Sequence, residues 1–273
     1  MIYIHTALSI EASPLIDGFK LKKDMDVNEF QVFGNEDMMM IISGVGKVKS
    51  AMALSYLFGK YGVCEKDILL NIGYCGSSSD EVPLGMLMLA NKVVDMDTGR
   101  EYFPDLFLTG YRQRCISCFS NVVKRSTENT ENIFVDMESA GVMEASYKFL
   151  YPHQTVIVKI VSDYLDDERK DVSFLKSLMT ENLSNIEDII KQAKEIAGMT
   201  KGLDMAEEYA MLERISENMR FTKGMMNLLR PNVRKAKIKG YDTIGILHGF
   251  LDRKSSSRIE RKRVFDELLK KLK

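Results

Sequence analysis

Short β-rich runs alternate with helical patterns over residues 1–198, and this alternation restricts the fold more than any other feature of the chain. The pattern is typical of α/β proteins, in which helices cover a sheet. The predicted strands are Ile2–Leu8, Glu29–Phe33, Met38–Ser43, Ile68–Ile72, Met86–Val94, Cys115–Val122, Ile133–Asp136 and Thr155–Val161. The predicted helices are Lys47–Tyr61, Glu138–Leu150 and Val172–Ala197, the last with apolar residues at roughly helical spacing.

The charge of the chain changes sign near residue 200. Residues 200–273 carry a balance of +8 and residues 1–199 a balance of −9, although the net charge is only −1. Such a change suggests two units with different surroundings. We therefore expect an α/β domain over residues 1–198 and a basic, mainly helical extension over residues 199–273.

Within the extension, good helix formers with amphipathic spacing predict helices over Met205–Asn218 and Arg258–Leu272. Pro231 and Gly240 are expected to break the region between them. The basic stretch Arg253–Arg263 has three open interpretations: a solvated helix face, a surface for an acidic partner, or a contact with nucleic acid phosphates.

Several classes of protein are disfavoured by composition. No apolar stretch reaches the roughly 18 residues needed to span a bilayer, and the N-terminal residues do not resemble a signal peptide. Four cysteines in 273 residues do not form a disulfide framework. We expect a cytoplasmic protein without a membrane partner.

Cys115 and Cys118 have the spacing of a redox or metal pair. A zinc site needs about four ligands, and His5, His153 and His248 are isolated in the sequence. We therefore favour two buried strand cysteines and expect no metal.

Two glycine-containing segments follow predicted strands. Ser43-Gly44-Val45-Gly46-Lys47 joins a strand to a helix, and Asn71-Ile72-Gly73-Tyr74-Cys75-Gly76 takes a second strand into an expected turn. Glycines allow close packing of strand and helix, and they also allow a ligand to approach the backbone. The first segment has neither P-loop nor dinucleotide-binding spacing, so both interpretations stay open.

Three carboxylates, Glu11, Glu138 and Asp163, each follow an apolar strand-like run. The ends of strands form the mouth of an α/β sheet, where such proteins collect ligands. Each carboxylate also has a structural interpretation. Glu11 and Glu138 suit the first turn of a helix, and Asp163 suits a cap.

The order of these motifs resembles the purine nucleoside phosphorylase and nucleosidase superfamily, particularly its methylthioadenosine/S-adenosylhomocysteine nucleosidase branch. The resemblance runs from Ile2 to about Ala197. The segments that carry it are the two glycine segments, Val94–Tyr102, Asp136–Ala140 and the pair Ser162-Asp163.

The resemblance implies a three-layer α/β sandwich with a central mixed, twisted sheet, no cofactor, and a homodimer or larger homo-oligomer. It implies hydrolysis of a purine nucleoside, with an adenosine-type base and a modified 5′ position as in methylthioadenosine, S-adenosylhomocysteine or 5′-deoxyadenosine. Asp163 would donate toward the departing base, and Glu11 would activate the attacking water. Glu138 would accept hydrogen bonds from the ribose. The other implied substrate-binding residues are Met137, Ser162, Gly73, Tyr74 and Phe119.

The departures from the family pattern bear on the reaction. Phosphorylases of the superfamily place an arginine for phosphate where this chain has Asn71, so water is the expected attacker and phosphorolysis the alternative. Tyr74 replaces a small serine, and the interval from Gly76 to Met137 is shorter than usual. That interval normally supplies an aromatic contact to the base, for which Phe119 is the candidate. A non-catalytic nucleoside-binding or scaffold protein is the third alternative.

Overall fold

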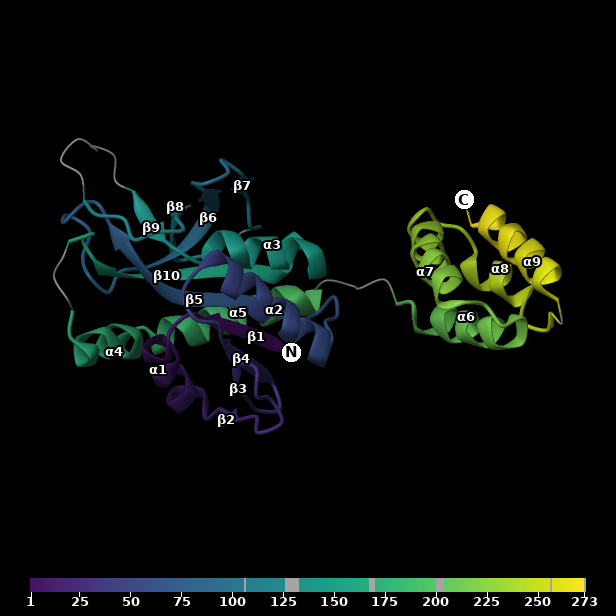
Figure 1. The fold of residues 1–273 in the computed structure, drawn as a ribbon, viewed down its shortest axis with the longest axis horizontal. Coiled ribbons are helices and arrows are strands. Elements are labelled where there is room, and N and C mark those ends of the chain that lie inside the picture. The colour runs from purple at the N-terminus through teal and green to yellow at the C-terminus, as the bar shows by residue number, and fades with distance from the viewer. Residues whose placement is uncertain (106, 126–132, 167–169, 200–203, 256, 273) are drawn as a thin grey trace. The chain divides into compact units, whose positions relative to one another are not determined.

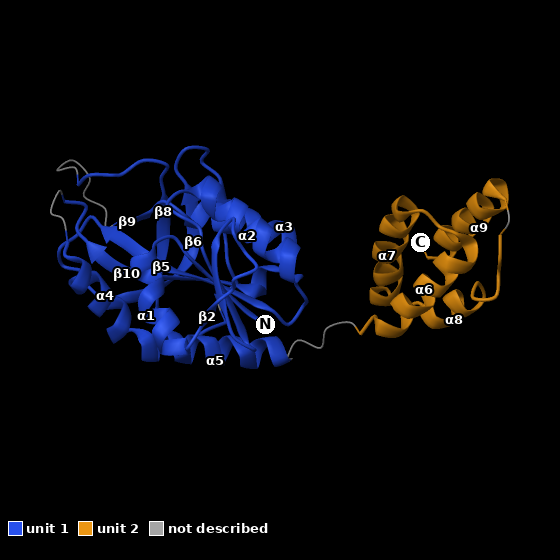
Figure 2. Cartoon of the chain, turned by 60° about the horizontal axis from the view of Figure 1, so that its bottom comes forward, with its two compact units in different colours: residues 1–200 blue, residues 201–273 orange. Residues whose placement is uncertain are grey.

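The computed structural model describes residues 1–105, 107–125, 133–166, 170–199, 204–255 and 257–272 (Figure 1). By its internal contacts the chain divides into two compact units, Met1–Thr200 and Lys201–Lys273 (Figure 2). Among the helices described, none combines the length and apolarity that crossing a membrane requires.

A mixed sheet forms the centre of the first unit. Its strands, within the described residues, are β1 (Ile2–Thr6), β2 (Lys22–Lys23), β3 (Gln31–Gly34), β4 (Met38–Ile42), β5 (Ile68–Ser77), β6 (Leu87–Asp95), β7 (Glu101–Tyr102), β8 (Arg112–Cys118), β9 (Phe134–Asp136) and β10 (Thr155–Asp163). β1 runs parallel to β4 and β5, and β5 runs parallel to β10. β5 also pairs antiparallel with β9, and β10 pairs antiparallel with β6.

Part of this sheet closes on itself. β6 pairs with β8, β8 with β9, and both β9 and β10 with β5, so β5, β10, β6, β8 and β9 form a ring of paired strands. β5 and β10 are buried along nearly their whole length, which explains why their sequences are apolar on both faces.

Helices cover both faces of the sheet. α2 (Lys47–Tyr61) and α3 (Ser139–Phe149) pack on one face, and α1 (Ser9–Phe19), α4 (Val172–Glu181) and α5 (Leu183–Met199) lie on the other (Figure 1). A short 3-10 helix, Pro152–Gln154, precedes β10. The predicted α/β fold with a central mixed sheet is confirmed.

The second unit contains α6 (Ala206–Met219), α7 (Lys223–Ile238), α8 (Thr243–His248) and α9 (Arg258–Lys271). These helices enclose their own apolar core, in which Leu212, Leu229 and Leu268 are fully buried. Inside it, the Glu208 carboxylate accepts hydrogen bonds from Thr243 and pairs with Lys237 at 2.6 Å.

Two predictions about glycine and proline were wrong. The strand β5 does not end in a turn at Gly73 but continues to Ser77, because its backbone remains paired with β10 and then β9. Pro231 does not break the second unit, because α7 runs through it. The burial of Leu229 and Val233 on either side stabilises the helix against the loss of one backbone hydrogen bond.

Two further predictions need correction. The helix predicted over Val172–Ala197 is two helices, α4 and α5. They are separated at Asn182, whose side-chain amide donates to the carbonyls of Leu178 and Gly85. Cys118 is buried as expected, but Cys115 is exposed. Residues three apart in a strand point to opposite faces, which accounts for the difference.

Candidate active site

A pocket of about 400 Å³ lies where β1, β5, β9 and β10 end or are followed by loops and helices. Its volume is within the roughly 300–1,000 Å³ of small-molecule sites. Five carboxylates line it, from Glu11, Asp136, Glu138, Asp163 and Asp166, and Lys170, which pairs with Asp166 at 3.6 Å, lines it as well. The carboxylates come from three separate segments, and the sheet brings them together.

Glu11 is the third residue of α1, beyond the end of β1, and its side chain is buried. Its Oε2 accepts the backbone N–H groups of Ala7 and Leu8 at 2.9 and 2.8 Å, and its Oε1 accepts that of Tyr74 at 2.9 Å. The bond from Leu8 also caps the helix, so the structural interpretation of Glu11 holds as well.

Burial raises the pKa of Glu11 above its ordinary value, although its backbone hydrogen bonds oppose this shift. A carboxylate with a raised pKa accepts a proton more readily, as a general base must.

The second glycine segment brings its backbone unusually close to this carboxylate. A Cβ built on Gly73 would lie 2.9 Å from Glu11 Oε1 and 3.6 Å from Lys159 Nζ. A Cβ on Gly76 would lie 2.2 Å from Leu165 Cδ2 and 2.8 Å from Asp163 Oδ1. Any larger residue would displace these side chains, so the two glycines make space for them rather than for a turn.

Glu138 is the residue directly before α3, and its carboxylate connects the site to the first glycine segment. Its Oε1 accepts the backbone N–H of Gly46 at 2.9 Å. Gly46 has a φ of 114°, a conformation that favours glycine. Burial raises the pKa of Glu138, with Lys159 acting in the opposite sense.

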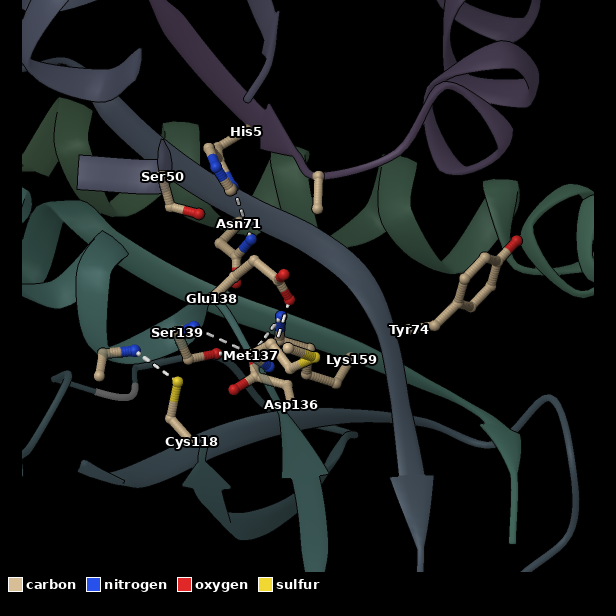
Figure 3. Close-up of polar contacts among 12 residues, drawn as sticks. His5, Ser50, Asn71, Tyr74, Cys118, Asp136, Met137, Glu138, Ser139 and Lys159 are labelled. Atoms are coloured by element: carbon tan, nitrogen blue, oxygen red, sulfur yellow. Dashed lines mark hydrogen bonds and ion pairs between the residues drawn. The ribbon is translucent and has the colours of Figure 1, made fainter. Parts of the chain in front are cut away.

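A buried ion pair lies beneath these carboxylates (Figure 3). Lys159 Nζ lies 2.8 Å from Asp136 Oδ2, and the two side chains are 1% and 0% exposed. Asp136 Oδ2 also accepts hydrogen bonds from the backbone and hydroxyl of Ser139. Burial alone would lower the pKa of Lys159, but Asp136 and Glu138 hold it above its ordinary value.

The same Lys159 ammonium holds the pKa of Asp136 below its ordinary value, against the opposing effect of burial. Both members of the pair are therefore charged at neutral pH.

A series of neutral side chains, linked by hydrogen bonds, lies close to this ion pair in the interior of the first unit. Burial lowers the pKa of His5 to about 3, and Lys159 adds to this shift. His5 Nδ1 lies 2.9 Å from Asn71 Nδ2 (Figure 3). Its Nε2 lies 2.9 Å from Ser43 Oγ. Since the amide donates to Nδ1, the neutral ring donates from Nε2 to the serine.

Asp163 is the last residue of β10 and lies at the pocket wall. Its Oδ2 accepts the hydroxyl of Ser162 at 2.6 Å, and its Oδ1 accepts the backbone N–H of Leu165 at 3.0 Å. The second bond is the capping interaction that the sequence also suggested.

The structure brings most of the predicted site residues together. Met137, Ser162 and Tyr74 line the pocket with the predicted carboxylates. Two predicted substrate-binding residues are not among the described lining residues. Gly73 lies against the Glu11 carboxylate, and Phe119 lies outside the lining. Phe119 is half-buried, and its backbone N–H donates to the Asp136 carbonyl at 2.9 Å.

Lys159 is the main site residue that the sequence analysis missed. It is a charged residue in the middle of the apolar run Val156–Val161, and its isolation there was the available signal. A buried lysine requires a partner of opposite charge, so Lys159 predicts a buried carboxylate beside it. Among the described residues, no group of three His, Cys, Asp or Glu side chains is arranged to hold a metal ion.

Comparisons with known proteins agree with this fold. Residues 27–132 match the family model described as "Phosphorylase superfamily". A methylthioadenosine/S-adenosylhomocysteine nucleosidase from Oceanobacillus iheyensis is 23% identical over 221 residues, which cover 64% of this chain and 93% of that protein.

Two solved structures have a similar fold. The futalosine hydrolase of Helicobacter pylori has a TM-score of 0.59 at 18% identity, covering 70% of this chain and 97% of its own. The methylthioadenosine/S-adenosylhomocysteine nucleosidase of Campylobacter jejuni has a TM-score of 0.56 at 20% identity, covering 71% and 98%. These comparisons support the phosphorylase superfamily for residues 27–132, and the fold resembles that of the methylthioadenosine/S-adenosylhomocysteine nucleosidases.

Proposed function

We propose that this protein is a nucleosidase that hydrolyses the N-glycosidic bond of an adenosine-type purine nucleoside, with a modified 5′ position. The observation that carries the proposal is the convergence of Glu11, Glu138 and Asp163 on one pocket. Cleavage of an N-riboside develops positive charge on the sugar and negative charge on the base, so it needs carboxyl groups in different roles.

In the proposed reaction Glu11 is the general base. Its Oε1 accepts one backbone hydrogen bond, whereas its Oε2 accepts two, so Oε1 is the oxygen better able to accept another. That oxygen takes a proton from a water molecule as the water attacks C1′ of the ribose. The raised pKa of Glu11 suits this step.

Glu138 accepts hydrogen bonds from the ribose hydroxyls, and Met137 packs against the sugar. Support for this assignment comes from the position of both residues in the pocket wall and from the Gly46 N–H that fixes the carboxylate. A carboxylate held in this way strengthens its contacts as the sugar becomes cationic.

Asp163 donates a proton or a hydrogen bond to the imidazole part of the purine as the C1′–N bond breaks. The Ser162 hydroxyl, 2.6 Å from Oδ2, orients the carboxyl group. The departing base leaves with the electron pair of the glycosidic bond, and the water oxygen forms the new bond to C1′.

The surroundings of the pocket favour water over phosphate as the nucleophile. Asn71, at the position where phosphorylases carry an arginine, is buried and occupied with His5. No arginine is found among the described lining residues of the pocket, and a phosphate dianion is held best by a guanidinium.

The named activities of similar proteins support the same class of reaction. The O. iheyensis and C. jejuni relatives are nucleosidases for methylthioadenosine and S-adenosylhomocysteine, and the H. pylori relative is a futalosine hydrolase. As an extension of the proposal we expect a homodimer or larger homo-oligomer, which sedimentation analysis measures.

The test is incubation of the purified chain with adenosine, methylthioadenosine, S-adenosylhomocysteine, 5′-deoxyadenosine and inosine, with and without phosphate. Free base and sugar are measured by chromatography. We expect base release that is independent of phosphate and lost in Asp163→Asn. The control is Asp17→Asn, on the exposed side of α1. Release that requires phosphate and yields a sugar phosphate would refute hydrolysis.

A further inference from the structure

The carboxylate of Glu138, which the proposed function assigns to the ribose, depends on a backbone group from a distant segment. Its Oε1 accepts the N–H of Gly46, the residue directly before α2, at 2.9 Å. The carbonyl of the same glycine accepts the backbone N–H and the hydroxyl of Ser50, one turn into the helix. Gly46 therefore moves with the start of α2, and the position of this helix start determines whether its N–H reaches Glu138.

The start of α2 is an unfavourable place for an unpaired cation. The residue before the helix is a glycine, which has no side chain to cap it, and the first turn contains no acidic residue. Lys47 and Lys49 both lie in that turn, where the positive end of the helix dipole repels an ammonium group. An unpaired Lys47 would therefore weaken this end of the helix.

The ammonium group of Lys47 is instead paired with two carboxylates from the end of β6. Its Nζ lies 2.5 Å from Asp95 Oδ1 and 2.5 Å from Asp97 Oδ2. The side chains of Lys47 and Asp95 are only 13% and 11% exposed, so water screens the attraction between them little. Although burial opposes it, the two carboxylates hold the pKa of Lys47 above its ordinary value.

The two aspartates are themselves held in place by further hydrogen bonds. Asp95 Oδ1 accepts the backbone N–H of Asp97 at 3.1 Å, and its Oδ2 accepts the hydroxyl of Thr98 at 2.8 Å. The carboxylate of Asp97 also accepts the hydroxyl of Ser120. The turn between β6 and β7 therefore presents two fixed negative charges to the start of α2.

The backbone of Lys47 lies against the helix that follows Glu138. α2 and α3 pack side by side (Figure 1), and a Cβ on Gly141 would lie 2.0 Å from the carbonyl oxygen of Lys47. Gly141 is three residues after Glu138 in the chain. A shift of the start of α2 would therefore change its position relative to α3 and to the carboxylate that precedes α3.

We propose that Lys47 is a positioning residue. Through its two aspartate partners it holds the start of α2, so that the N–H of Gly46 stays on Glu138 and fixes this carboxylate for the ribose hydroxyls. The inference rests on the proposed nucleosidase function, because that function assigns the ribose to Glu138. It also gives a role to the segment Val94–Tyr102, whose resemblance to the superfamily the proposed reaction leaves unexplained.

The test compares the full-length wild type with Lys47→Met, which keeps most of the side-chain volume and removes the charge. Values of kcat and KM are measured for methylthioadenosine and for its 2′-deoxy analogue, which lacks one of the hydroxyls assigned to Glu138. We expect kcat/KM for methylthioadenosine to fall about tenfold, the effect of one hydrogen bond to a charged group. The fall should lie mainly in kcat, since the contact strengthens as the sugar becomes cationic, and it should be smaller for the 2′-deoxy analogue.

Lys92→Met is the matched control. Lys92 Nζ pairs with Glu101 Oε1 at 2.6 Å and so joins β6 to β7, and Lys92 does not line the described pocket. Its loss should leave the ratio of the two kcat/KM values unchanged. Lys47→Arg, which keeps the positive charge, should restore the wild-type ratio.

Asp97→Asn keeps the test decisive if Lys47→Met does not fold. The side chain of Asp97 is 46% exposed, so this variant removes one of the two negative charges without opening the interior. It should change the ratio in the same direction as Lys47→Met, but by less.

Hydrogen exchange tests the position of Gly46 without a substrate. Its amide should exchange faster in Lys47→Met than in the wild type or in Lys92→Met. Unchanged exchange at Gly46, or an equal fall in kcat/KM for the two substrates, would overturn the inference even if the wild type proves to be a nucleosidase. A wild type that neither binds nor cleaves any nucleoside would overturn the proposed function and the ribose role with it. Exchange at Gly46 would then still decide whether Lys47 holds the start of α2.

Discussion

Replacement of Lys159 by methionine removes the cation of the buried ion pair while keeping most of the volume of the side chain. The wild-type pair is short, 2.8 Å, and nearly inaccessible to water, with exposures of 1% and 0%. In the variant, Asp136 is left in the interior without its counter-charge. It keeps the two hydrogen bonds from Ser139, which compensate in part.

The expected loss of stability follows from this burial. Removing one partner of a buried pair costs about 3–5 kcal/mol, because the other charge is then uncompensated. The hydrogen bonds of Ser139 place the expected loss at the lower end, about 3 kcal/mol. A typical domain has about 5–15 kcal/mol of stability, so the variant should fold but be markedly less stable.

The loss should also depend on pH. In the wild type the pKa of Asp136 is lowered, so this group stabilises the fold above its unfolded pKa and loses that effect as pH falls through the folded value. In Lys159→Met we expect a raised pKa for the same group, which destabilises the fold progressively above about pH 4. The difference between the two proteins should therefore grow as the pH rises from 4 to 7.

Unfolding in urea is monitored by hydrogen exchange in peptides from β5 and β10, because these peptides report on the first unit alone. The double variant with Asp136→Asn is the control, and it should lose less stability than the sum of the two single variants. A loss below about 1 kcal/mol in Lys159→Met, or one that does not vary with pH, would refute the reasoning.

Three further expectations concern the site and the two units. Gly73→Ala places a Cβ 2.9 Å from Glu11 Oε1 and should lower kcat/KM by about a hundredfold, whereas Gly59→Ala, which meets nothing within 4 Å, should not lower it; equal activities would contradict this. The pKa of Glu11 is raised, and the base must be ionised to act. As the pH is lowered, kcat/KM should therefore begin to fall while the pH is still above about 4.3, the ordinary pKa of a glutamate. A fall that begins only below this pH would argue against Glu11 as the base. A chain that ends at Thr200 should keep nucleoside binding by calorimetry, since the first unit contains the pocket; loss of binding by a folded truncation would contradict this.

The architecture could be predicted from the sequence because apolar residues recur with a clear helical or strand period in most of the elements. α2 has the predicted bounds, Lys47–Tyr61, and the central strands differ from their predicted bounds chiefly at their ends. α1 was absent from the predicted helices because Pro14 and Gly18 disguise its pattern. In the structure Pro14 lies within the helix and is buried.

The candidate site was less predictable, because its geometry depends on contacts between distant segments. Glu138 could be singled out from its position before a helix, but not its bond to Gly46, which lies 92 residues earlier. The glycines of β5 suggested a turn, since sequence alone does not show which group approaches a glycine. A Cβ at Gly73 would take the space of the Glu11 carboxylate, and one at Gly76 would take the space of the Leu165 side chain and the Asp163 carboxylate.

The balance of charge at the pocket gives a physical reason for cleavage through a cationic sugar. Five carboxylates line the pocket, of which Lys159 neutralises chiefly Asp136 and Lys170 pairs with Asp166, so Glu11, Glu138 and Asp163 are left. Even if either Glu11 or Glu138 is protonated, the remaining charge is negative, and it is fixed before the substrate arrives. Fixed negative charge stabilises an oxocarbenium-like sugar more than the neutral ground state, which lowers the barrier. The same charge repels a phosphate dianion. The field that would accelerate hydrolysis therefore also selects water as the nucleophile.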